Sequence, residues 1–216
     1  MNELLTIVLA TSNPGKILEL RALLADLPIQ LVPVAEVLGE QPNIVEDGAT
    51  FQENALIKAR AVSQATRTFA LADDSGLEVD ALAGRPGVRS ARFAHERATD
   101  AENNAALLCE LEDVEASARG ARFRCVLALV SPFHESDVYL AEGSSEGSIC
   151  RVPRGNGGFG YDPLFVVAGH AGKTMAELAE SEKNRVSHRA RAVQSLRGVV
   201  LKLLNAKLDE AERIAG

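Results

Sequence analysis

The stretch at the centre of this sequence is Phe69-Ala-Leu-Ala-Asp-Asp-Ser-Gly-Leu77. A short apolar run reaches Ala72 and then meets two adjacent carboxylates, a hydroxyl and a glycine, which is typical of a buried strand that ends at a functional site. Neighbouring carboxylates repel each other unless a cation neutralises them, and Mg²⁺ is commonly held by one or two carboxylates together with substrate phosphates. A solvated turn is the alternative interpretation, and the tetrapeptide Asp73–Gly76 alone favours that turn.

The N-terminal part predicts a strand, a polar loop and a helix. Leu4–Ala10 is apolar and partly β-branched, as in a buried parallel strand. Thr11–Lys16 follows, and a helical pattern continues beyond it. Such a helix N-terminus attracts anions, and Lys16 is placed to reach a phosphate. The loop is not a Walker A motif, because the first glycine and the final Ser/Thr are missing. A plain strand-to-helix turn capped by Ser12 or Asn13 is an equally good interpretation.

Between this loop and the central stretch, the pattern predicts a strand at Gln30–Val34, a loop at Gly39–Asp47 and a helix. The helix opens with the capping box Thr50–Glu53 and runs to about Ala65. Lys58 lies beside its apolar face, where a lysine either extends to solvent or points into a cleft. Glu46, just upstream, is a candidate third carboxylate.

The second half of the chain is richer in strand patterns. A capping box at Thr99–Glu102 predicts a helix through about Leu111, and Arg119–Val130 reads as a central strand. Val138–Ala141 and Ser144–Val152 read as an antiparallel meander. This change near residue 115 suggests a second lobe, and a cleft between lobes is a common ligand site.

Gly155–Pro163 is a glycine-dense loop that holds Phe159 and Tyr161, in a chain with only seven Phe, two Tyr and no Trp. Glycines let a backbone approach a ligand closely, and an aromatic ring in such a loop can stack on a base. The alternative is a flexible hairpin whose Phe159 fills the core. We favour the functional interpretation.

Cations gather around the start of the last predicted helix, at about Ser187. Glu180–Arg189 follows a third capping box at Thr174–Glu177. Three cations near a helix N-terminus oppose the helix dipole and are costly without an anion. A solvated charged face is the commoner explanation for such a run.

Composition limits the class of partner. The chain has 216 residues, a net charge of −7 and a pI near 5.2, which argue against general nucleic-acid or anionic-membrane binding. A small polyanionic substrate is still compatible with this net charge. The three cysteines match no zinc spacing or disulfide framework, so we expect free thiols in a reducing compartment. The N-terminal apolar run is too short to span a membrane and lacks a basic leader. We therefore expect a cytoplasmic protein.

Four ordered motifs together resemble the ITP/XTP pyrophosphatase family, which removes deaminated purine nucleotides. They are Thr11–Lys16, Asp73–Gly76, Gly158–Pro163 and Ser187–Arg189. The resemblance runs from about residue 6 to residue 200. Each motif is weakly specific, but the ordered set is highly specific.

The resemblance implies an elongated α/β fold of two lobes around a long mixed β-sheet with flanking helices, with the nucleotide in the cleft between the lobes. It implies one domain over residues 1–216, with residues 1–114 and 170–216 in one lobe and 115–169 in the other. It also implies Mg²⁺ as cofactor and a homodimer, with no nucleic-acid or membrane partner.

The resemblance also carries roles to individual residues. Glu46 and Asp74 correspond to Mg²⁺ ligands, and Asp74 also to the proton acceptor. Lys58 corresponds to a further phosphate contact. The remaining residues correspond to substrate contacts with the triphosphate, the base or both: Thr11, Ser12, Asn13, Pro14, Gly15, Lys16, Ser75, Phe159, Gly160, Tyr161, Asp162, Lys183, His188 and Arg189.

The expected reaction is hydrolysis of ITP, dITP or XTP to the monophosphate and pyrophosphate. A related pyrophosphatase for modified pyrimidine or methylated nucleotides is one alternative. The His188-Arg189 helix start and the Phe159–Asp162 loop argue against it. A non-catalytic nucleotide sensor is another, against which Lys16, Glu46 and Asp74 together argue. An aspartyl-phosphate phosphatase would need Asp-x-Asp after the strand, whereas here the two acids are adjacent.

Overall fold

The computed structural model describes residues 5–134 and 136–215. The chain forms two compact units, each assembled from separate segments. Unit 1 comprises Met1–Asp73, Val126–Glu142 and Ala192–Gly216, and unit 2 comprises Asp74–Cys125 and Gly143–Arg191. The described part of the predicted first strand begins at Leu5, and Leu4 lies outside the described residues.

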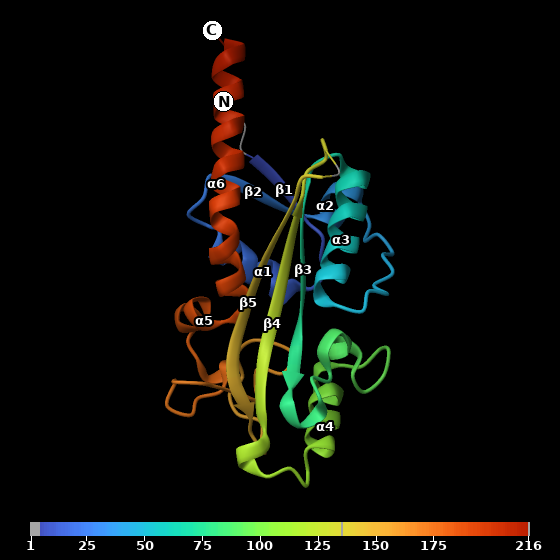
Figure 1. The fold of residues 1–216 in the computed structure, drawn as a ribbon, viewed down its shortest axis with the longest axis vertical. Coiled ribbons are helices and arrows are strands. Elements are labelled where there is room, and N and C mark those ends of the chain that lie inside the picture. Colours follow the sequence, from blue (N-terminus) through green and yellow to red (C-terminus); the bar gives the residue numbers. More distant parts are fainter. Residues whose placement is uncertain (1–4, 135, 216) are drawn as a thin grey trace. The chain divides into compact units, whose positions relative to one another are not determined.

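The strands form a six-stranded sheet in the order β2-β1-β3-β4-β5-β6. Figure 1 labels the first five of these strands along the chain. β1 pairs in parallel with both β2 and β3, whereas β5 and β6 are antiparallel. The sheet is therefore mixed, and the predicted α/β fold with a mixed sheet and helices is confirmed. The strands are β1 Leu5–Leu9, β2 Ile29–Pro33, β3 Phe69–Val79, β4 Gly120–Val130, β5 Val138–Ile149 and β6 Phe165–Val167.

The helices begin and end close to the predicted positions. The capping boxes at Thr50–Glu53 and Thr99–Glu102 both form, and they start α3 and α4. Each supplies partners for N–H groups that a helix start leaves without an intrahelical acceptor. The helices are α1 Pro14–Leu23, α2 Val34–Leu38, α3 Phe51–Thr66, α4 Asp100–Glu110, α5 Glu180–Val186 and α6 His188–Ala215. Short 3₁₀ turns occur at Asp80–Leu82, Gly87–Arg92, Ala116–Ala118 and Met175–Glu177.

Each unit buries its own apolar side chains. In unit 1, Ile7 and Leu9 of β1 and Ala55 and Ala59 of α3 are fully buried. In unit 2 the core includes Leu77, Val79, Leu107, Phe123 and Phe165. The predicted apolar faces of these elements are therefore the buried ones.

The central stretch differs from its prediction. Asp73-Asp74-Ser75-Gly76 neither ends the strand nor forms a turn, because β3 continues to Val79. Apolar side chains resume at Leu77 and Val79, both fully buried, and neighbouring strands pair along the sheet. The two carboxylates consequently lie inside a buried strand, with Asp73 1% and Asp74 8% exposed. Buried carboxylates need partners, which makes their surroundings informative.

The predicted meander is also wrong. Val138–Ile149 forms the single strand β5, and Glu142 and Gly143, which looked like a break, lie within it. A glycine weakens a strand interior without ending it.

The unit boundaries do not coincide with the lobe boundaries expected near residues 114 and 170. The chain passes from one unit to the other within β3, β4, β5 and α6. A change in sequence pattern does not mark such a passage, because each of these elements continues through it.

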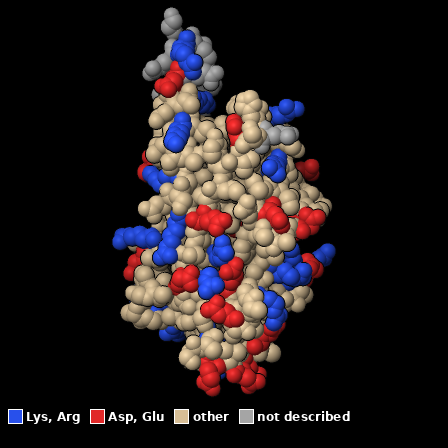
Figure 2. Space-filling view, in the orientation of Figure 1, with Lys and Arg blue, Asp and Glu red and all other residues tan. Residues whose placement is uncertain are grey.

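Charges of both signs are intermixed on the face shown in Figure 2, in keeping with a modest net charge of −7. In the part of the chain that the structure describes, no helix is long and apolar enough to cross a membrane.

Candidate active site

The loop Thr11–Lys16 joins β1 to α1 in unit 1. Asn13 is the helix N-cap, since its Oδ1 accepts the Lys16 N–H at 3.1 Å, and Thr11 Oγ1 accepts the Asn13 N–H at 3.2 Å. Pro14 occupies the first turn, where its missing N–H costs nothing. Ser12, Asn13 and Pro14 are exposed. The loop is thus both a capped turn and an accessible helix start that directs Lys16 towards β3.

Strand register explains where Lys16 points. β1 and β3 are parallel, with Leu9 opposite Leu71, so the residues after β1 lie beside Asp73. Lys16 Nζ is 2.7 Å from Asp73 Oδ1 and 3.3 Å from the Asp73 carbonyl oxygen. The register therefore brings the loop lysine to the carboxylate pair.

Lys58 approaches the same carbonyl from α3. Its Nζ donates to the Asp73 carbonyl oxygen at 3.1 Å and forms an ion pair with Glu46 Oε2 at 2.7 Å. The Lys58 side chain is 10% exposed, so it points inwards and does not extend to solvent. Lys16, Glu46, Lys58 and Asp73 form one group, here called the lysine cluster. All four belong to unit 1.

The family resemblance assigns the metal-ligand and proton-acceptor roles to Asp74 and assigns no role to Asp73. Its carboxylate and its carbonyl each accept a lysine, so it organises the cluster. Two features of the sequence point to Asp73: the adjacent carboxylate pair and the pattern of parallel strands. Parallel pairing places the residues that follow one strand beside those of the next, so the loop after β1 lies beside Asp73.

The donor chemistry fits a hard divalent cation. Glu46 and Asp73 offer carboxylate oxygens, and Mg²⁺ is typically bound through one or two carboxylates plus substrate phosphates. Among the described residues, no group of three His, Cys, Asp or Glu forms a protein-only metal site. The predicted ligands Glu46 and Asp74 belong to units 1 and 2 respectively.

Unit 2 holds the other predicted residues. Ser75, next to Asp74 in β3, accepts a hydrogen bond from Arg189 Nη2 at 3.0 Å. Arg189 also lies 5.7 Å from the centre of the Phe159 ring, and Lys183 Nζ lies 5.1 Å from it. Two cations thus border one aromatic ring, a geometry that is favourable for the cations and for a stacked base.

Asp162 orders the glycine-dense loop. Its Oδ2 accepts the Phe159 N–H at 3.1 Å and pairs with Lys183 Nζ at 2.7 Å. Gly158 has φ +73°, and a Cβ there would lie 1.9 Å from Asp162 Oδ2. The loop is therefore a built structure that requires glycine, and Phe159 is only partly buried. We call Phe159, Asp162, Lys183 and Arg189 the aromatic cluster.

The Tyr161 side chain is buried in unit 2. It is 4% exposed, and its hydroxyl donates to the Ser90 carbonyl at 2.8 Å. Burial, with a smaller effect from the Asp100 charge, raises the pKa of this phenol well above its usual value. The Tyr161 side chain therefore anchors the loop, whereas the Phe159 ring is partly exposed.

The cations near Ser187 divide between two helices, which corrects the expected single helix start. Lys183 and Arg185 lie in the last turn of α5, where the dipole favours cations. Ser187 Oγ then accepts the Ala190 N–H at 3.1 Å as α6 begins. His188 stacks on Phe123, with ring centres 4.8 Å apart and planes at 16°. Only His188 and Arg189 remain at a helix start.

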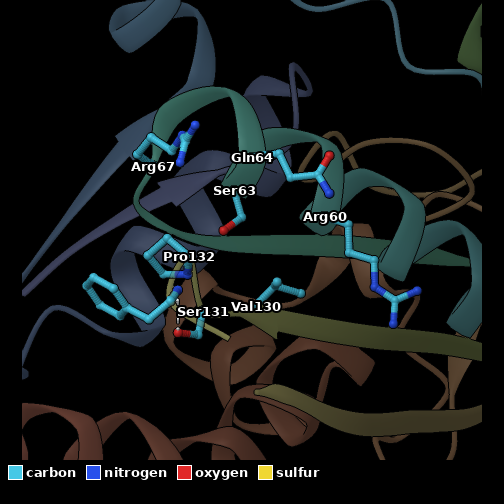
Figure 3. Close-up of a pocket in the computed structure, with 8 residues that line it drawn as sticks. Arg60, Ser63, Gln64, Arg67, Val130, Ser131 and Pro132 are labelled. Atoms are coloured by element: carbon cyan, nitrogen blue, oxygen red, sulfur yellow. Dashed lines mark hydrogen bonds between the residues drawn. The ribbon is translucent and has the colours of Figure 1, made fainter. Parts of the chain in front are cut away.

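A cavity of about 550 Å³ in unit 1 lies apart from these groups. It is lined by residues of α3 and its C-cap and by residues at and after the end of β4: Arg60, Ser63, Gln64, Arg67, Val130, Ser131, Pro132 and Phe133 (Figure 3). The Arg60 and Arg67 side chains point in different directions. None of the predicted site residues lines this cavity, so size alone does not identify the reactive site.

The chain is thus an α/β protein with a mixed sheet, buried lysine–carboxylate pairs in unit 1, and in unit 2 an aromatic ring bordered by two cations. Comparison with known proteins identifies the family. The model of the Ham1 family matches residues 7–199, and the chain belongs to that family.

The similarity to curated relatives extends over almost the whole chain. A dITP/XTP pyrophosphatase of Bacillus licheniformis is 47% identical over 95% of this chain and 98% of its own. One from Thermus thermophilus is 52% identical over 88% and 89% of the two chains. The solved structure of a HAM1 protein from Coxiella burnetii is 46% identical and covers 92% of this chain and 100% of its own, with a TM-score of 0.83. The predicted family is confirmed.

Proposed function

We propose that this chain hydrolyses non-standard purine nucleoside triphosphates, dITP, XTP and ITP, to the monophosphate and pyrophosphate. The observation that carries this proposal is the convergence of Lys16 and Lys58 on Asp73, next to Asp74. The relatives named dITP/XTP pyrophosphatase support it, because their similarity covers nearly the full length of each chain.

The lysine cluster is assigned to the phosphates. Lys16 and Lys58 carry positive charges held in place by buried or half-buried acceptors. Fixed cations stabilise negative charge that grows on a leaving pyrophosphate, and they need no rearrangement during the reaction. The Thr11–Lys16 helix start adds N–H groups that attract a triphosphate.

Asp74 is assigned as the general base. It holds a water molecule and takes its proton as the water oxygen attacks the α-phosphorus, and the bond to the bridging oxygen of pyrophosphate breaks. Glu46 and Asp74 are the proposed Mg²⁺ ligands. Bound Mg²⁺ would neutralise the triphosphate and orient it for in-line displacement.

The aromatic cluster is assigned to the base. Phe159 provides a stacking face, and Lys183 and Arg189 supply donors beside that ring. His188, which stacks on Phe123, is assigned as a further donor to the base. Hypoxanthine and xanthine present a keto oxygen at the purine 6-position, where adenine presents an amino donor. A donor fixed at that place would be left unpaired by ATP, which can give discrimination of about 10⁴-fold or more.

We further propose a cytoplasmic homodimer. Cys109, Cys125 and Cys150 are free thiols, which suits a reducing compartment, and the dimer is implied by the family resemblance. Light scattering coupled to size-exclusion chromatography checks the dimer. A mass near 46 kDa, twice the 23.0 kDa chain, is expected, and a monomer mass would contradict it.

The test of function is pyrophosphate release from dITP, XTP, ITP, GTP, ATP and dTTP, with Mg²⁺ and with a chelator. Fast Mg²⁺-dependent release from dITP, XTP and ITP only is the expected result. Turnover of modified pyrimidine or methylated nucleotides in their place would favour the related pyrophosphatase. Binding of dITP without release would make the chain a sensor.

A further inference from the structure

Gly160 of the glycine-dense loop, here also called the aromatic loop, is held by α4. This helix has no role in the site predicted from the sequence. The Gly160 N–H donates to Asp100 Oδ2 at 2.7 Å, and the Gly160 carbonyl accepts from Asn104 Nδ2 at 2.9 Å. Asp100 and Asn104 are four residues apart on α4 and therefore lie on the same helix face. Both polar backbone groups of Gly160 are thus bound by one helix, within unit 2.

This clamp acts next to the ring assigned to the base. Gly160 has φ +60° and no side chain, so only its backbone can be held. On the other side of Phe159, the N–H of Phe159 is bound by Asp162. The backbone is therefore fixed immediately before and immediately after the Phe159 side chain.

We propose that Asp100 and Asn104 are positioning residues that hold Gly160 and thereby present the Phe159 ring to the purine. This inference rests on the proposed function of Phe159 as the stacking residue. A ring that is already in place when the base arrives saves the entropy of ordering the loop, and that saving appears as tighter binding of the base. The clamp touches no phosphate-binding residue, so the affinity for the phosphates does not depend on it.

The substitutions are chosen so that the loss of a contact to Gly160 can be told apart from a general loss of stability of α4. Asn104 lies inside α4, where alanine has the higher helix propensity, so Asn104→Ala removes the contact without weakening the helix. Asp100 lies in the first turn, where its charge favours the helix dipole. Asp100→Asn keeps an oxygen that can accept the Gly160 N–H, whereas Asp100→Ala removes it.

The experiment uses the full chain with Asn104→Ala, Asp100→Ala and Asp100→Asn. Asp113→Ala is the matched control, because Asp113 is an exposed acid that follows α4. For each chain we would measure KM and kcat for dITP, inhibition constants for IMP and for inorganic tripolyphosphate, and the melting temperature. IMP reports on the base, and tripolyphosphate reports on the phosphate side alone.

Asn104→Ala and Asp100→Ala are expected to raise KM for dITP and the inhibition constant of IMP by about three- to tenfold, the effect of one lost hydrogen bond. We expect kcat and the tripolyphosphate constant to stay within about twofold of wild type, since no phosphate contact changes. Asp100→Asn should recover most of the loss, and Asp113→Ala should match wild type.

Unchanged IMP affinity in both alanine variants overturns the inference, and so does an equal weakening of tripolyphosphate. A wild-type chain that binds IMP but releases no pyrophosphate from dITP, XTP or ITP would contradict the proposed function alone. In that case the IMP inhibition constants of the variants still test whether Asp100 and Asn104 position Phe159. A wild-type chain that binds no IMP contradicts the inference, because the Phe159 ring would then not hold the base.

Discussion

At the scale of single residues, the adjacent acids Asp73 and Asp74 have different surroundings although they are chemically identical. Asp73 is bound to Lys16 through its carboxylate and to Lys16 and Lys58 through its carbonyl. Side chains of neighbouring strand residues point to opposite faces of the sheet. The next residue, Asp74, is 8% exposed and is the one assigned as base.

Asp74→Asn is expected to lower kcat for dITP by roughly 10²- to 10⁴-fold, because an amide cannot take the proton of the attacking water. The shape of the side chain is kept, so the melting temperature should change little. Asp113→Asn serves as the control for loss of one carboxylate. A rate for Asp74→Asn near that of wild type would show that Asp74 is neither base nor essential metal ligand.

The buried Tyr161 phenol is expected to make the free energy of unfolding depend on pH. Burial raises the pKa of its phenol in the folded chain above the ordinary value of about 10. Above pH 10 the unfolded chain loses this proton and the folded chain keeps it, so the free energy of unfolding falls as pH rises. Chemical denaturation between pH 8 and 11 measures this fall.

Tyr161→Phe should flatten the alkaline part of that profile. It should also lower the free energy of unfolding at pH 7 by about 1 kcal/mol, through the lost bond to the Ser90 carbonyl. A variant with the same alkaline slope as wild type would assign the pH dependence to another group.

At the scale of elements, the aromatic loop is held by three separate contacts: Asp162 within the loop, Ser90 on the Tyr161 hydroxyl, and α4 on Gly160. Together they turn a glycine-rich segment into a defined surface. Glycine supplies the positive φ angles and the close approach, and polar side chains supply the rigidity.

Gly158→Ala is predicted to disrupt this loop, because its Cβ would lie 1.9 Å from Asp162 Oδ2 and 2.9 Å from Lys183 Nζ. Strain at positive φ also costs about 1–3 kcal/mol. Gly84→Ala is the matched control, with φ +86° and no atom within 4 Å of its Cβ. Both variants should lose stability, but only Gly158→Ala should also raise KM for dITP. Equal KM values in the two variants would contradict the role of Gly158 in the site.

At the scale of the whole molecule, the chain passes between its two units inside β3, β4, β5 and α6, and at no point in a linker. Within unit 2, Arg119 joins segments far apart in sequence. Its guanidinium, 2% exposed, donates to the carbonyls of Leu111 and Ile149 at 2.7 and 2.9 Å. Burial lowers the pKa of this guanidinium, and these bonds offset the cost of burying its charge.

Arg119→Met is expected to reduce the free energy of unfolding by roughly 3 kcal/mol, because several buried carbonyls lose their donor. Arg151→Met is the control, since exposed Arg151 donates to the carbonyls of Glu112 and Val114 at 3.1 Å. Urea denaturation compares the two. A loss for Arg119→Met no greater than for Arg151→Met would contradict this account.

The α/β class, the capping boxes that begin α3 and α4, and the family could all be predicted from the sequence. These depend on local chemistry and on ordered motifs, which can be recognised along the chain. The local pattern did not predict that Asp73–Gly76 lies inside a strand, that β5 is one strand, or that Lys183 and His188 belong to different helices. The contacts of Asp73, Tyr161, Asp100 and Asn104 are visible only in the folded chain, because their partners are distant in sequence. Pairing between strands and packing across helices set those contacts, and no local pattern encodes them.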